Sequence, residues 1–122
     1  MSCCPYCCVP AEDAWVSTEF VIAIPHANAL TPCHLAIVPR RHVSSFYDLD
    51  VQEQHVIWDV LAQLQRRIAD KITVEGFDVG FVDARAGTDP AFHAYVHLLP
   101  RIAGQNVTRA AGAEWVDLGF VP

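Results

Sequence analysis

Two histidines and a tyrosine alternate along the stretch FHAYVHLLPR, residues 92–101. His93, Tyr95 and His97 are spaced two residues apart, which places all three side chains on one face if the segment is a strand. Imidazole and phenol rings can bind metal, exchange protons or attack an electrophilic phosphorus. The residues between them are apolar and suit a buried face. This alternation predicts a site on the polar face rather than an ordinary solvent-exposed strand.

Four of the five cysteines lie in the stretch CCPYCC, residues 3–8. Cysteines this close in sequence do not readily pair with one another in unstrained disulfides, and an odd total leaves one unpaired. The first residues lack the features of a secretory signal, so we expect a reducing, cytoplasmic location, where such clusters more often bind metal. From the residues alone, zinc binding and a set of cysteines without metal are equally open.

The length and composition predict one folded domain spanning residues 1–122. Of the 122 residues, 52% are hydrophobic, which is enough for a core of ordinary size. The net charge of −6, from eight Lys and Arg against fourteen Asp and Glu, argues against nucleic acid as a partner. No apolar run reaches the roughly 18 residues that a membrane span requires, so we expect no membrane association.

The elements that must position these residues form an α+β pattern. A long helix is expected after Asp50, which can form a capping box with Glu53, and its apolar residues recur at i, i+3, i+4 spacing. Gly76 ends this region, and Pro100 closes the last strand before an irregular tail with one short strand. Strands on either side of a single helix favour an antiparallel sheet. Four strands are expected before the tail, at 15–25, 35–39, 77–83 and 92–99.

Taken in this order, the motifs resemble those of the histidine triad (HIT) superfamily of nucleotide hydrolases and nucleotidyl transferases. The stretch HAYVHLLPR is similar to the family's His-x-His-x-His signature, which is followed by apolar residues and often Pro-Arg. TPCHLAIVPRRHVSSFYDL resembles the family's Pro-Gly-His and Pro-Lys-Arg-His stretch, and GFDVGFVDARAG and CPYC resemble two further motifs. The resemblance covers about residues 3–101. It implies an antiparallel sheet of about five strands with one long helix packed on it.

The resemblance also implies a structural zinc ion, because family members that open with Cys-x-x-Cys hold one. Carried over to this chain, the ligands are Cys4, Cys7, His42 and His93. Two thiolates and two imidazoles suit a closed tetrahedral zinc site, with residues 1–10 as the zinc-binding segment and 102–122 as the C-terminal tail. Cys3 and Cys8 flank the pair as alternative ligands, and a domain without metal stays open as well.

The resemblance places a pocket beside the same strand, but several residues depart from the family pattern. The family's middle histidine attacks the α-phosphorus, and this chain has Tyr95 there. His26 stands where the family has a ribose-binding Asp, and Asp78 where it has an Asn. So many departures indicate a naturally divergent member. The expected catalytic residues are Tyr95, His97 and His34. The expected ligand-binding residues are His26, Asn28, Asp78, Asp89 and Arg101.

Three functions fit these residues. The first is a divergent hydrolase or transferase that acts on a nucleotide or another small phosphorylated metabolite, with Tyr95 as nucleophile and His97 or His34 as its base. A second is different chemistry, with Tyr95 as the acid and one of these histidines as the base. The third is a catalytically inactive protein that binds a small molecule and keeps the fold stabilised by zinc. The resemblance further implies a homodimer.

Overall fold

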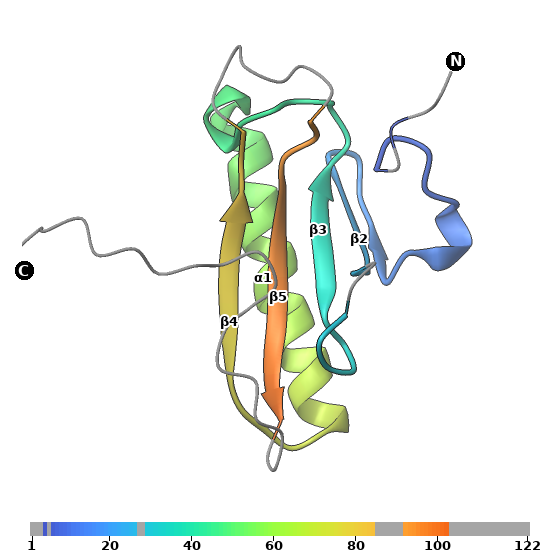
Figure 1. Ribbon diagram of the computed structural model, residues 1–122, viewed down its shortest axis with the longest axis vertical. Coiled ribbons are helices and arrows are strands. Elements are labelled where there is room, and N and C mark those ends of the chain that lie inside the picture. Colours follow the sequence, from blue (N-terminus) through green and yellow to red (C-terminus); the bar gives the residue numbers. More distant parts are fainter. Residues whose placement is uncertain (1–3, 5, 27–28, 85–91, 103–122) are drawn as a thin grey trace, which may run out of the picture.

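The computed structural model describes residues 4, 6–26, 29–84 and 92–102 (Figure 1). They form a five-stranded antiparallel sheet with strand order β1-β2-β3-β5-β4, and one long helix lies across one face of it. The prediction of an α+β fold is confirmed. The strands are β1 (Val16–Ser17), β2 (Val21–Pro25), β3 (Leu35–Pro39), β4 (Val74–Val82) and β5 (Tyr95–Ile102). The helices are α1 (Val51–Lys71) and two 3-10 turns, Ala11–Asp13 and Phe46–Asp48.

Helix α1 begins with the capping box that the sequence predicts. The Asp50 carboxylate accepts a hydrogen bond from the Glu53 amide (2.9 Å), and the Glu53 carboxylate accepts one from the Asp50 amide (3.1 Å). Glu53 is also paired with Arg41, whose guanidinium lies 2.7 Å from its carboxylate. This pair ties the start of α1 to the segment after β3, the segment that carries His42.

Two strand predictions need correction. The segment 15–25 is not one strand but two, β1 and β2, because Thr18 forms a turn between them: its hydroxyl accepts hydrogen bonds from the Phe20 and Val21 amides. Strand β5 begins at Tyr95 rather than residue 92 and continues through Pro100. Its pairing with β3 ends at Leu98, so the missing N–H of Pro100 costs no hydrogen bond to β3.

The region around β4 also differs from expectation. Helix α1 ends at Lys71, and Gly76 lies within β4 at a register shift rather than at the helix end. β4 starts at Val74, three residues before the predicted strand. The expected tail strand lies outside the described residues, as do Asn28 and Asp89. Within the described residues, no helix has both the length and the hydropathy to cross a membrane.

The two faces of the sheet have different roles. One face packs on α1 and forms the main core, in which Ala94, Val96 and Leu98 are buried as the alternation predicts. The opposite face carries a smaller apolar cluster with Tyr95 at its margin. His97 pairs with Ala36 on one side and Gly80 on the other, so its side chain lies on this second face beside Tyr95. The second face is therefore where the polar residues gather. The small cluster is built from Ile22, Ile24, Ala36 and Val38.

Candidate metal centre and histidine cluster

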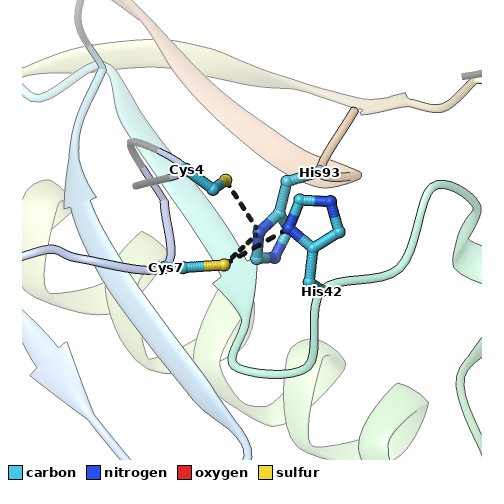
Figure 2. A group of neighbouring side chains, drawn as sticks. All are labelled: Cys4, Cys7, His42 and His93. Atoms are coloured by element: carbon cyan, nitrogen blue, oxygen red, sulfur yellow. Dashed lines mark hydrogen bonds between the residues drawn. The ribbon is translucent and has the colours of Figure 1, made fainter. Parts of the chain in front are cut away.

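Three separate segments bring two cysteines and two histidines together at one end of the sheet (Figure 2). Cys4 and Cys7 lie in a turn closed by a hydrogen bond from the Cys7 amide to the Cys4 carbonyl (3.0 Å). His42 follows β3, and His93 precedes β5. One ligand atom from each of the four residues lies within 4.8 Å of all the others. The four residues expected to bind zinc are therefore grouped as a metal centre requires.

The orientation of His93 fits metal binding. Its Nε2–H donates to the Pro39 carbonyl (2.8 Å), which leaves the Nδ1 lone pair directed at the cysteines. Nδ1 lies 3.5 Å from Cys4 Sγ and 3.4 Å from Cys7 Sγ, and Cys7 Sγ lies 3.3 Å from His42 Nδ1. Zn–S and Zn–N bonds of about 2.3 and 2.0–2.1 Å put sulfur and nitrogen roughly 3.5 Å apart in a tetrahedron. The donor set and its spacing thus fit zinc.

Neither Cys3 nor Cys8, the cysteines that flank the pair in sequence, is part of the group that the structure describes. Cys8 is disulfide-bonded, so it is not an available thiolate ligand, and Cys3 lies outside the described residues. The expectation that the clustered cysteines avoid disulfides is wrong for Cys8. Cys4, Cys7 and Cys33 are free thiols. Of the pairs that the sequence left open, the structure supports Cys4 with Cys7.

A second cluster of imidazoles lies on the sheet face opposite α1. His26 and His34 flank the β2–β3 loop, and their rings stack with centroids 4.2 Å apart and an interplanar angle of 6°. The Leu30 amide donates to His34 Nδ1 (3.2 Å), so neutral His34 carries its proton on Nε2. That proton points to His97 Nδ1, 3.2 Å away. His97 therefore accepts at Nδ1 and carries its own proton on Nε2, facing Gly80.

Tyr95 joins this cluster through a residue that was not expected to be its base. Its hydroxyl lies 3.4 Å from His26 Nε2, whereas His34 Nε2 is directed at His97 Nδ1. The sequence placed His26 among ligand-binding residues because it stands at a family Asp position. In the β2–β3 hairpin, the His26 amide donates to the His34 carbonyl, and this pairing places the His26 imidazole next to Tyr95. The sequence did not show this placement. The simpler expectation was that His97, two residues along the same strand, would be the base.

The imidazoles are shielded from solvent. His26 is 8% exposed, His34 1% and His97 3%, whereas Tyr95 is half-buried. Burial lowers the pKa of all three histidines, and for His34 the neighbouring His26 and His97 lower it further, to about 4. These groups are therefore neutral near pH 7 and can accept protons. Tyr95 is therefore the more accessible member of the cluster, and an open pocket in front of it stays a prediction.

Two of the remaining expected ligand-binding residues, Asp78 in the middle of β4 and Arg101 near the end of β5, lie on neighbouring strands. Asp78 and Arg101 approach each other with the Arg101 Nε 3.6 Å from the Asp78 carboxylate, and both side chains are nearly half exposed. Gly80, between Asp78 and the end of β4, faces His97. A Cβ at Gly80 would lie only 2.7 Å from His97 Nε2, so this position must remain a glycine for the imidazole to keep its place.

A model of the HIT domain family matches residues 11–104. The chain belongs to the HIT family. Among solved structures, a HIT family protein from Bacillus subtilis covers 88% of this chain and 82% of its own, with a TM-score of 0.69 at 18% identity. A Zn-bound histidine triad family protein from Mycobacterium smegmatis covers 79% and 69%, with a TM-score of 0.65 at 21% identity. At these identities the structural matches establish a shared HIT fold.

Curated relatives of this HIT protein act on nucleotides according to their names. It is 32% identical to the AP-4-A phosphorylase of Mycobacterium tuberculosis over 87 residues, 70% of this chain and 45% of that protein. It is 25% identical over 100 residues, 82% of this chain and 55% of the relative, to the bifunctional bis(5'-adenosyl)-triphosphatase/adenylylsulfatase FHIT of Arabidopsis thaliana. The chain thus spans about half the length of the relatives it matches.

The buried histidines make the HIT protein's stability depend on pH. Because the pKa of His34 falls from 6.5 to about 4 on folding, the unfolded chain binds more protons between these values. Protonation of His34 therefore does not reduce the free energy of unfolding above pH 6.5. As the pH drops towards 4, His34 lowers this free energy by an amount on the order of 2 kcal/mol. Urea unfolding at pH 7 and pH 5 measures the difference.

A matched pair of variants isolates the contribution of His34. His34→Asn keeps an acceptor for the Leu30 amide but does not titrate, so it should lose less stability between pH 7 and 5 than the native chain. His55→Asn, at an exposed position on α1, should follow the native profile. Equal pH dependence in the native chain and His34→Asn would mean that groups other than His34 cause the loss of stability.

Proposed function

We propose that this HIT protein is a slow hydrolase or transferase for a nucleotide or another small phosphorylated metabolite, with Tyr95 as the nucleophile. The observation that carries this proposal is the Tyr95 hydroxyl, half-buried and 3.4 Å from a neutral imidazole nitrogen of His26. Tyr95 also stands at the position of the family's attacking histidine. The nucleotide substrates named for its relatives support the ligand class.

In the proposed reaction, the Tyr95 oxygen bonds to phosphorus while the bond from phosphorus to the leaving oxygen breaks. The phenolic proton passes to His26 Nε2, and the leaving group takes a proton from the site or from water. Water then attacks the tyrosyl ester, releases the phosphorylated product and restores the phenol. A phenol is a weak nucleophile without a base, and an aryl phosphate ester lasts longer than a phosphoramidate, so turnover should be slow.

The covalent intermediate is the direct test of this mechanism. A dinucleoside polyphosphate is incubated with the protein, quenched with acid and analysed by intact-protein mass spectrometry followed by peptide mapping. We expect slow hydrolysis and a nucleotidyl adduct on the peptide that contains Tyr95. Rapid turnover without an adduct would refute Tyr95 as the nucleophile. Saturable binding with neither adduct nor product would favour the ligand-binding alternative, which the burial of His26, His34 and His97 supports.

We further propose that the metal centre holds zinc in a structural role. Cys4, Cys7, His42 and His93 would supply all four ligands, leaving no open position for a reacting group. The centre lies at the end of β5 that carries Tyr95, two residues beyond His93. Zinc would therefore fix the start of this strand, while Tyr95 and His26 supply the chemistry.

A cytoplasmic location also remains a proposal.

We propose a homodimer formed through the β4 edge of the sheet. β4 is an edge strand of the described sheet, and Trp58 and Phe81, each 47% exposed, form an aromatic surface with Phe46 beside it. Antiparallel pairing of two β4 strands about a two-fold axis would cover both the unpaired backbone edge and these rings.

Light scattering coupled to size exclusion tests the proposed dimer. Phe81→Glu places a charge in the aromatic surface and should shift the protein to monomer. Val51→Glu, at an exposed position on α1 that is 66% accessible, should leave the dimer intact. A monomeric native chain, or a dimer unaffected by Phe81→Glu, would refute this interface.

A further inference from the structure

Tyr6 lies between the two cysteines of the metal centre and also contacts Tyr95. Its ring centroid is 5.0 Å from that of Tyr95 and 6.0 Å from that of His93. One side chain therefore touches both a candidate metal ligand and the candidate nucleophile. Metal binding by Cys-x-x-Cys requires only the two thiolates, so an aromatic residue at this position needs another explanation.

The turn that carries Tyr6 determines where its ring lies. The Cys7 amide donates to the Cys4 carbonyl (3.0 Å), and Tyr6 is the third residue of this four-residue turn. Figure 2 shows both cysteine side chains of the turn directed at His93. With the turn anchored in this way, Tyr6 packs on the small apolar cluster of the sheet face opposite α1, the cluster at whose margin Tyr95 lies.

We propose that Tyr6 is a positioning residue that closes one side of the Tyr95 site, and that metal binding by Cys4 and Cys7 holds it there. Cys7 is exposed and Tyr6 is only half-buried. One turn hydrogen bond and the contacts of this ring with Tyr95, His93 and the small apolar cluster are too weak to order a surface segment against its conformational entropy. Without the metal, the turn therefore detaches and Tyr95 becomes exposed while the sheet remains folded.

This inference rests on the proposed metal centre but does not require catalysis. The metal centre is structural in the proposed function, and here it gains a second role as the element that sets access to Tyr95. Substrate that reaches Tyr95 must fit beside the Tyr6 ring in the metal-bound protein. Failure of the nucleotidyl adduct to form would leave the Tyr6 contact untouched, because the two are measured separately.

Hydroxyl-radical footprinting with peptide mass spectrometry tests the position of Tyr6, because it reports solvent access to each ring. The chain has three tyrosines, and Tyr47, 88% exposed, serves as the internal reference. In protein carrying one equivalent of zinc, Tyr6→Ala should raise Tyr95 oxidation several-fold relative to Tyr47. Tyr6→Phe keeps the ring and should match the native chain. Unchanged Tyr95 oxidation in metal-loaded, folded Tyr6→Ala would overturn the proposal.

Zinc removal from the native chain by a chelator tests the second half of the proposal. We expect Tyr95 oxidation to rise to the level of Tyr6→Ala, and chelation of Tyr6→Ala to add little. Amide exchange across β3 and β5 is followed in the same samples and should stay slow. Two results would overturn the proposal that the metal holds Tyr6 in place. One is that Tyr95 stays protected from oxidation after metal loss. The other is that amides throughout β3 and β5 lose their protection from exchange at the same time, which would mean global unfolding.

Discussion

Replacing Cys7 by Ser is expected to abolish most metal binding and to lower the free energy of unfolding by several kcal/mol. Cys7 Sγ approaches both His42 Nδ1 and His93 Nδ1, so its loss removes a ligand that contacts both imidazoles of the centre. The free energy of binding a structural zinc ion is in large part folding free energy. Metal analysis of purified protein and urea unfolding with and without zinc measure the two effects.

Cys33→Ser is the matched control for this substitution. Cys33 is also a free thiol, but it lies outside the metal-ligand group. The control should retain one equivalent of zinc per chain. A native chain that binds far less than one equivalent, or a Cys7→Ser variant with native zinc content and stability, would contradict the proposed centre.

Tyr95→Phe is expected to eliminate both nucleotide turnover and the covalent adduct while leaving fold and zinc content unchanged. The substitution removes the attacking oxygen but keeps the ring that packs against Tyr6 and the small apolar cluster. Its effect on stability should be no more than about 1 kcal/mol, the contribution of one hydrogen bond. Single-turnover kinetics, adduct mapping and metal analysis on the same preparation test all three expectations.

The control for this experiment is Tyr47→Phe, which removes a hydroxyl from an exposed ring. It should retain native turnover. Tyr95→Phe with undiminished turnover would refute the nucleophile. A change confined to ligand affinity, in a chain whose native form shows no turnover, would instead identify a binding protein.

Features determined by local sequence were predictable. The capping box and apolar face of α1 depend on residues three and four apart, and both appear as expected. The grouping of Cys4, Cys7, His42 and His93 followed from the family resemblance, since no local rule joins residues so far apart. The division between β1 and β2 was missed because its turn contains neither Gly nor Pro and depends on the Thr18 hydroxyl.

The histidine cluster was harder to anticipate because it depends on a hairpin and on backbone geometry. Pairing of β2 with β3 carries His26 over Tyr95, and a tautomer set by the Leu30 amide orients His34 towards His97. Cys33, just before His34, has a left-handed backbone with φ of 68°. The resembling family motif has Gly before this histidine, and a residue with a Cβ adopts this conformation at a cost on the order of 1 kcal/mol. Side-chain identity alone does not reveal such a placement.

The metal centre also has a consequence for the synthesis of the protein. Cys7 and His42 are 35 residues apart in sequence, and Cys7 and His93 are 86 apart. During translation, the cysteine turn therefore leaves the ribosome long before the last ligand has been made. A four-ligand site cannot exist on the nascent chain until His93, just before β5, has emerged. Capture of the proposed zinc ion would thus be a late event of biogenesis, coupled to closure of the long loop between the cysteine turn and His93.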